Sequence, residues 1–567
     1  MRRTVCLVAL LVGLYACDRG SAPTTGTAAP QFVSSTISDP KTFNPILIVD
    51  NTSREATQLV FDSLVRTSPV TLKTEPWLAE RWEHDDTGTS WTFHLRRDVR
   101  WHDGQPFTAA DVAFTFRAVF DERVPNSSKF TLTVDGKPIS VEAIDDHTIR
   151  IQTPRPFAPL LSALEQAILP AHLLSKSLDD GEFVRQWGID VAPDKIVGTG
   201  PYRLTQYVPA QFLRYERNPN YWKKDAEGQA LPYIERRTIL IVPNQDTSYL
   251  KFLAGETTEL PPRPEEVADL RQKAASLHAK VEEVGIDAGN LFVAFNRNPK
   301  HYIRDGKRDP RIDWFSDLNF LRAIAHAVDK QAMIVNCFSG HARPAVSMIS
   351  PSNALYHNPN LQDYVYDLDR AGALLTEAGY VDKNGDGWRE DKDGNVVEFN
   401  LNTNSGNQVR EKVCSILKED WTKLGLKVNY RPLDFTALVE RLDSTYDWDA
   451  ILIGFTGTPE PNNGANLLRS NGNLHLWHPR QEKPATSWEA EIDTLLDQGS
   501  RVLEPDARRP FYWRIQEILH RELPMIETVH QVEHIAYRDN LENYRRTVWE
   551  LDQPEMIRFR SIPGALD

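Results

Sequence analysis

The chain has 567 residues, of which 41% are hydrophobic and 25% are charged, and its formal net charge is −14. A chain of this length can bury several cores, so we expect it to fold as more than one lobe. The acidic balance and the lack of any run of five or more basic residues exclude the class of nucleic-acid-binding proteins. Beyond residue 17, charges interrupt every apolar stretch before it reaches the length of a transmembrane helix.

The first residues have the order of an export signal. Two arginines precede the apolar run Val5–Leu14, which is too short to span a bilayer. Ala16 directly before Cys17 resembles a bacterial lipobox, which implies a signal peptide over residues 1–16 and a lipid anchor on Cys17. Asp18 resembles an inner-membrane retention signal, so we expect a periplasmic location at the inner membrane, or a cell-surface lipoprotein. An ordinary secretory leader with an incidental cysteine is the alternative.

Residues 17–31 differ from the rest of the chain in their distribution of apolar residues. The first stretch is rich in Ser, Ala, Pro, Thr and Gly without apolar periodicity, which predicts a flexible tether. From residue 32 onward, short strands such as Trp91–Leu95 alternate with amphipathic helices. Thr108 and Asp111 form a capping box that opens one helix, and Gly379 and Gly425 end two others. The pattern predicts a mixed α/β fold.

Several sequence blocks follow one another in a characteristic order. They are Trp77–Trp82, Trp91–Arg96, Val99–Val112, Gly198–Tyr202, Arg217–Trp222 and Leu321–Lys330. Together they resemble the family 5 extracellular solute-binding proteins, which serve oligopeptide, dipeptide and nickel importers. Taken by themselves the blocks are structural, since Gly198-x-Gly200-Pro201 lacks the third glycine and the opening helix of a dinucleotide-binding turn.

The resemblance implies a periplasmic-binding-protein fold with two lobes and three domains. The first domain would be assembled from discontinuous segments, residues 32–79, 198–289 and 511–567, with the second domain over 80–197 and the third over 290–510. A peptide or peptide-like solute would be captured between the lobes by hinge closure and delivered to the permease of an ABC importer. The protein would act as a monomer and meet the membrane only through its lipid.

Two loops carry the expected ligand contacts. Asn404, Ser405 and Asn407 join the predicted strand Val397–Leu401 to a helix that starts near Val409. Loops at strand ends face the crevice of an α/β lobe, and helix N-terminal N–H groups can bind a carboxylate. The alternative is a polar helix cap that meets no ligand.

The second loop follows the predicted strand Ile451–Gly454 and offers Phe455, Thr456 and Glu460. In peptide-binding relatives this place carries a Trp and then an Asp-Tyr-x-Asp-Pro motif, whose first Asp pairs with the α-ammonium of the ligand. Here Phe455 stands in place of the Trp, and Glu460 is the nearest carboxylate. We therefore predict that Glu460 contacts a cationic group, against the alternative of a solvated turn between prolines. The departure leaves a non-peptide ligand open, either an oligosaccharide or a metal chelate.

A metal ion is expected at most in one hairpin, and no other cofactor is expected. Asp382, Asn384 and Asp386, followed by Gly387, resemble the start of a calcium loop. Asp393 takes the twelfth position, where calcium loops have a longer Glu, so weak Ca²⁺ binding or a purely structural turn is predicted. The pair His475 and His478 has the spacing of a metal site but no third ligand nearby, and we interpret it as part of an irregular loop.

The chain is not expected to be an enzyme. It has no Gly-x-Ser-x-Gly, His-Glu-x-x-His or Gly-Lys-Ser/Thr motif. Its many carboxylates leave a periplasmic carbohydrate-active or other hydrolytic enzyme as the alternative. Cys337 and Cys414 could form a disulfide in an oxidising compartment, but two buried thiols are favoured.

Overall fold

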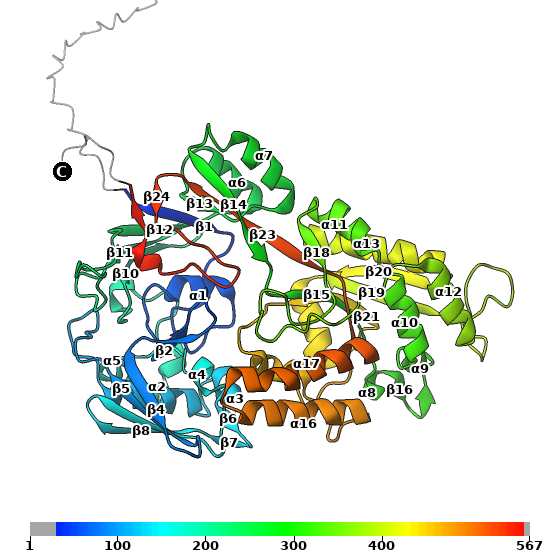
Figure 1. Cartoon of the computed structure of the whole chain (residues 1–567), viewed down its shortest axis with the longest axis horizontal. Coiled ribbons are helices and arrows are strands. Elements are labelled where there is room, and N and C mark those ends of the chain that lie inside the picture. Colours follow the sequence, from blue (N-terminus) through cyan, green and yellow to red (C-terminus); the bar gives the residue numbers. More distant parts are fainter. Residues whose placement is uncertain (1–29, 561–567) are drawn as a thin grey trace, which may run out of the picture.

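The computed structural model describes residues 30–560, so the expected signal peptide, Cys17 and nearly all of the tether lie outside the described residues. Helices and sheets form two lobes, with the first lobe at the left of Figure 1 and the second at the right. The predicted two-lobed α/β fold is confirmed. Between residues 30 and 560, no helix is both long and apolar enough to cross a bilayer.

The first lobe contains two four-stranded sheets. One has the order β1-β12-β11-β10, with β1 parallel to β12 and the other pairs antiparallel, and the second is antiparallel with the order β4-β5-β9-β8. Their strands are β1 (Phe32–Thr36), β4 (Ala79–His84), β5 (Ser90–Leu95), β8 (Ser140–Asp145), β9 (Thr148–Gln152), β10 (Tyr202–Val208), β11 (Phe212–Arg217) and β12 (Arg236–Ile241). The helices are α1 (Asn51–Thr57), α2 (Ala109–Phe120), α3 (Ser128–Thr131), α4 (Leu160–Ala163) and α5 (Ala171–Asp179). Short hairpins pair β2 (Val65–Thr67) with β3 (Thr74–Pro76) and β6 (Thr133–Val134) with β7 (Lys137–Pro138).

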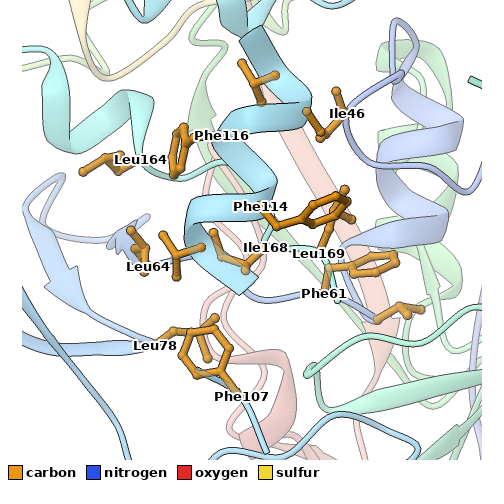
Figure 2. Packing of buried hydrophobic residues seen from close by; sticks show 14 of the residues in the cluster. Ile46, Phe61, Leu64, Leu78, Phe107, Phe114, Phe116, Leu164, Ile168 and Leu169 are labelled. Atoms are coloured by element: carbon orange, nitrogen blue, oxygen red, sulfur yellow. The ribbon is translucent and has the colours of Figure 1, made fainter. Parts of the chain in front are cut away.

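Helix α2 lies at the centre of the first hydrophobic core. Thr108 caps the helix, and the capping box with Asp111 is present as predicted. Phe114 and Phe116 project from different sides of α2 into one cluster of buried apolar side chains (Figure 2). That cluster joins side chains of both sheets, so the two sheets of the first lobe share one hydrophobic core.

The backbone contacts of the block Gly198–Tyr202 explain its two glycines. The N–H of Gly200 donates to the carbonyl oxygen of Val60 at 2.9 Å, and the N–H of Tyr202 donates to that of Leu59 at 3.0 Å. A Cβ atom on Gly198 would lie 1.8 Å from the Val60 oxygen. The glycines therefore let two backbone segments touch inside the first lobe.

The second lobe is built on a five-stranded sheet of order β20-β19-β21-β15-β22. Its strands are β15 (Asn290–Phe295), β19 (Glu398–Asn404), β20 (Lys427–Leu433), β21 (Ala450–Phe455) and β22 (Met525–Glu527). The helices around it are α8 (Pro299–Tyr302), α9 (Arg311–Trp314), α10 (Leu318–His326), α11 (Lys330–Phe338), α12 (Leu368–Glu377), α13 (Gln408–Lys423), α14 (Phe435–Glu440), α15 (Ala465–Leu468), α16 (Ser487–Arg501) and α17 (Pro505–Glu522). A short hairpin pairs β16 (Ile303–Arg304) with β17 (Lys307–Arg308). The sheet includes β22, which ends at Glu527, beyond the end near residue 510 that was predicted for the third domain.

Strand β15 is buried on both faces of that sheet. Val293 and Phe295 belong to one core and Phe292 and Ala294 to another, as the alternation of side chains along a strand requires. Helices on both faces cover the sheet, so its central strands β15 and β21 are apolar along almost their whole length.

Two segments connect the lobes. They run from β14 (Ala279–Ile286) to β15 and from β22 to β23 (Val529–Arg538), and β23 extends from one lobe toward the other (Figure 1). Strand β23 pairs with β13 (Glu259–Leu260), β14 and β18 (Ala342–Pro344). The N–H of Thr528 donates to the Leu291 oxygen at 2.9 Å, and His530 Nδ1 lies 2.8 Å from the Gly289 oxygen. The two connecting segments are thus hydrogen-bonded to each other and form one hinge.

The remaining elements lie near this hinge or at the C-terminal end. They are α6 (Gln245–Leu253), α7 (Val267–Lys273), β24 (Leu541–Glu542) and β25 (Arg558–Phe559).

The lobes also touch away from the hinge. The N–H of Ala158 donates to the Ser500 oxygen at 2.8 Å, and the Arg155 guanidinium donates to Ser500 Oγ at 3.0 Å. Asn463 Nδ2 lies 3.3 Å from Ser162 Oγ. The end of α16 therefore meets the first lobe directly.

Candidate functional site between the lobes

The two loops predicted to carry the ligand lie beside each other. Strands β19 and β21 are parallel, with Leu401 opposite Ala450 and Asn402 opposite Ile451. Their carboxyl ends therefore share one edge of the sheet, which is where α/β folds bind ligands. Phe455 pairs with Asn290 at the start of β15, so this edge is also the hinge end of the sheet.

The structure corrects the local prediction around Asn404. Strand β19 continues to Asn404, beyond the predicted end at Leu401, because it stays paired with β20 as far as Leu433. Asn407 caps α13, since its side chain accepts the N–H of Arg410, so the helix-cap interpretation describes this residue. Ser405 is solvent-exposed.

The second loop starts with one packed and one free side chain. Phe455 stacks on Phe292 with ring centroids 5.9 Å apart, and Thr456 is exposed. A Cβ atom on Gly457 would lie 1.9 Å from the Ala288 oxygen. The loop therefore packs against the backbone of the segment that connects β14 to β15, so the predicted ligand contacts lie next to the hinge.

Arg410 is a site residue that was not predicted from the sequence. Its guanidinium donates to Asn404 Oδ1 at 2.8 Å and also lies beside Gly454, at the shared edge of β19 and β21. Burial lowers the pKa of Arg410, and within residues 30–560 no carboxylate forms an ion pair with it. A half-buried guanidinium without an anion is suited to receive one. Its position in the first turn of α13 was the only sequence signal.

Glu460 has a partner inside the protein. Its two carboxylate oxygens each lie 2.6 Å from a guanidinium nitrogen of Arg508, and Tyr512 Oη accepts from Arg508 at 2.8 Å. The side chains of Glu460 and Arg508 are 11% and 4% exposed, so the Glu460 carboxylate is not solvated as its flanking prolines suggest. A ligand cation would share this carboxylate with Arg508, and the ligand contact of Glu460 stays a prediction.

Four glutamates with shared electrostatic neighbours form an acidic cluster, which we define as Glu55, Glu165, Glu533 and Glu550. Burial raises the pKa of Glu165 and Glu533 to about 7 and raises those of Glu55 and Glu550 as well. Water nevertheless reaches all four side chains, since Glu55, Glu165 and Glu550 are exposed and Glu533 is half-buried.

The charges around the acidic cluster come from distant segments. Arg546 attracts Glu55, Glu533 and Glu550, while Glu165 and Glu550 repel each other. These residues lie on α1, after α4, on the hinge strand β23 and in the C-terminal segment. Arg54 and Arg66 also attract members of the cluster, so its carboxylates are only partly compensated by cations of the first lobe and the C-terminal segment.

The calcium-like hairpin is closed by its own hydrogen bonds. Asp382 accepts the N–H groups of Gly385 and Gly387 at 2.7 and 2.9 Å, and Asn384 Oδ1 accepts the N–H of Asp386 at 2.8 Å. Carboxylate oxygens of Asp382, Asp386 and Glu390 can lie within 4.8 Å of one another, so the third carboxylate is Glu390. The backbone hydrogen bonds lower the pKa of Asp382 without any metal ion. The turn is therefore stable as a structural element, and Ca²⁺ binding by Asp382, Asn384 and Asp386 stays a prediction.

We expect Ca²⁺ chelation to leave the melting temperature of the protein unchanged. The hydrogen bonds of Asp382 and Asn384 already fix the turn, so a metal ion would add little. Thermal unfolding with and without a chelator measures this. A drop restored by Ca²⁺ and abolished by Asp386→Ala would show a metal site instead.

Comparisons with known proteins agree with this geometry. Residues 73–475 match the family model of bacterial extracellular solute-binding proteins, family 5. The chain is 30% identical to heme-binding protein A of Haemophilus influenzae, with 94% of each chain covered. It is 25% identical to the oligopeptide-binding protein AppA of Bacillus subtilis, over 95% of this chain and 94% of that protein.

Solved structures show the same fold. The structure of NikA from Brucella suis in complex with Fe(III)-EDTA superposes with a TM-score of 0.78 at 23% identity, covering 94% of this chain and all of that one. The AppA structure with a nonapeptide gives a TM-score of 0.73 at 22% identity, covering 94% of this chain and 99% of that one. Family model, full-length relatives and lobed fold agree: the chain belongs to the family 5 bacterial extracellular solute-binding proteins.

Proposed function

We propose that this protein is the solute-binding component of an ABC importer and that its ligand is a peptide or a peptide-like zwitterion. The ligand lies between the lobes, with a carboxylate on Arg410 and a cationic group toward the acidic cluster. Binding draws the lobes together, and the permease recognises the closed form. The protein acts by binding and release, without catalysis.

The observation that carries this proposal is the guanidinium of Arg410. It lies at the carboxyl edge of β19 and β21, is half-buried, and has no ion pair within the described chain. A charge withdrawn from water without a partner is costly, so a ligand carboxylate there gains a charge-assisted, fork-like contact. Exposed Ser405 and Thr456 flank the same edge and can hydrogen-bond a peptide.

The ligand can be identified directly. Denaturing extraction of freshly purified protein, followed by mass spectrometry, should release a compound with a carboxylate and a protonated amine. A haem would instead give a Soret absorption band before extraction, and an oligosaccharide would give the mass of a compound without a carboxylate or an amine. Either result would contradict the zwitterion and leave the family assignment intact.

Replacing Arg410 with glutamine should weaken ligand binding by about 2–5 kcal/mol, which is roughly thirtyfold or more in affinity. The variant leaves the ligand carboxylate buried without its partner. Lys412→Gln removes a positive charge from an exposed position on the same helix and should change the affinity less than about twofold. Titration calorimetry with the extracted ligand measures both. Equal effects of the two substitutions would refute the role of Arg410.

Attachment to the membrane is part of the proposal and rests on Cys17, which lies outside the described residues. The Cys17→Ser variant should be released into the soluble periplasmic fraction, because a diacylated cysteine with a third chain anchors stably and a serine is not acylated. Cell fractionation followed by immunoblotting measures the release. A variant that stays on the membrane would indicate either export without cleavage of the leader or a different anchor.

A further inference from the structure

A cavity of about 310 Å³ lies in the second lobe at the edge of the sheet opposite the predicted ligand loops. Asn290 starts β15 at the hinge end, and Arg297, which lines the cavity, follows the other end of the strand. A strand of this length separates the two places by roughly 20 Å. Helices α8 and α9 flank the cavity, on the side of the second lobe that faces away from the first (Figure 1).

Most of the cavity wall is apolar. Trp477 and Trp488 form an aromatic side, with ring centroids 6.0 Å apart, and Ile312, Leu318 and Leu321 form an aliphatic side. The volume is at the lower end of the range for small-molecule sites, which combine such walls with a few polar groups. The walls suit a compact apolar body.

Arg297 is the charged group in the cavity without a local partner. Its Nη2 donates to the Leu523 oxygen at 2.9 Å, but its Nε is buried and without a hydrogen-bond partner among the described residues. No ion pair involves Arg297 within residues 30–560. Burial lowers the pKa of this guanidinium to about 10, although Glu489 and Glu522 attract it from a distance.

The neighbouring carboxylates are occupied. One oxygen of Glu489 accepts from His475, Trp477 and Gln481 at 2.8–3.1 Å, and the other accepts the N–H and Oγ of Thr486. This network also gives His475 a role without a metal ion. The side chain is buried on an irregular segment and donates a hydrogen bond to Glu489.

The remaining charges on the wall are paired in the same way. Glu522 accepts from Arg521 at 2.7 Å, and the Arg308 guanidinium pairs with Asp313. The Arg297 guanidinium is thus left without an ion-pair partner beside carboxylates that accept from other donors, an arrangement that an anion in the cavity would complete.

We propose that this cavity binds a small organic anion, with its carboxylate on Arg297 and its aromatic or aliphatic body between the tryptophans and the leucines. The site is separate from the interlobe site and does not depend on the proposed transport role. Its occupant belongs to the class of arylacetates and branched aliphatic carboxylates, which combine one anionic group with a compact apolar body.

Phenylacetate and phenylacetamide test the charge requirement, because they have nearly the same shape and differ in charge. Phenylacetate should bind the full-length protein at least about tenfold more tightly than the amide, as measured by titration calorimetry. In Arg297→Gln the two probes should bind equally weakly. The nearby exposed Arg304 is the matched control, and Arg304→Gln should keep the tenfold preference.

Trp488→Ala provides a second variant if Arg297→Gln does not fold. It should lower the affinity for both probes, while phenylacetate should still bind more tightly than the amide, since only the apolar wall is changed. The inference is overturned if phenylacetate does not bind at roughly 10 mM, if the amide binds as well as the acid, or if Arg410→Gln rather than Arg297→Gln abolishes binding.

Discussion

Replacing Glu460 with glutamine should lower the free energy of unfolding by about 3–5 kcal/mol. The substitution keeps the shape of the side chain but leaves the Arg508 guanidinium buried without its anion. Arg508 also holds Tyr356, Tyr512 and the Gly499 oxygen, so its displacement would disturb the α16–α17 pair. Chemical denaturation of the purified variant measures the change.

The exposed ion pair of Glu182 and Arg185 provides the control. Glu182→Gln should cost less than about 1 kcal/mol, because water screens that pair. A similarly small loss for Glu460→Gln would show that its pair with Arg508 does not stabilise the fold. Ligand titration at a temperature where the Glu460 variant stays folded tests the predicted cationic contact, and an unchanged affinity would refute that contact.

Replacing Gly198 with alanine should destabilise the first lobe by about 3 kcal/mol. The new Cβ would meet the Val60 oxygen at 1.8 Å, and the obstacle is backbone rather than a side chain that can rotate away. Separating the segments would also break the hydrogen bond from Gly200 to Val60. Thermal and chemical unfolding should both show the loss.

Gly464→Ala is the matched control for that prediction. Its Cβ would meet nothing within 4 Å, and the backbone there needs no positive φ. Such a change should be neutral or slightly stabilising, because alanine reduces the freedom of the unfolded chain. If the two glycine variants unfolded alike, close backbone approach would not be the reason for Gly198.

Local sequence signals predicted the elements well. The capping box at Thr108, the apolar stripe of α13 and the alternation in β5 each depend on residues within a few positions of one another. Strand β19 was predicted too short because Asn402 and Asn404 have low strand propensity, and pairing with β20 overrides it. The Gly-x-Gly block was recognised as structural, but its contact with Val60 lies far away in sequence and could not be foreseen.

The candidate site was predictable only in part. That the loops after β19 and β21 share an edge follows from parallel strands, and the structure brings them together. The partner of Glu460 lies 48 positions along the chain, and the acidic cluster draws on four separate segments. No periodicity or motif marks Arg410 or Arg297, because what distinguishes them is the lack of a nearby carboxylate, and only the folded chain shows it.

The two cysteines of the described chain have a practical consequence for measuring motion. Cys337 and Cys414 are free and buried, as favoured over a disulfide, and burial raises the pKa of both thiols, that of Cys337 to about 11. They stay protonated at neutral pH and hidden from maleimide reagents. A cysteine introduced at an exposed position on each lobe would therefore be the preferred point of attachment for a dye or spin label. In a Cys17→Ser background, the distance between two such labels would report opening and closing of the lobes without interference from the native thiols.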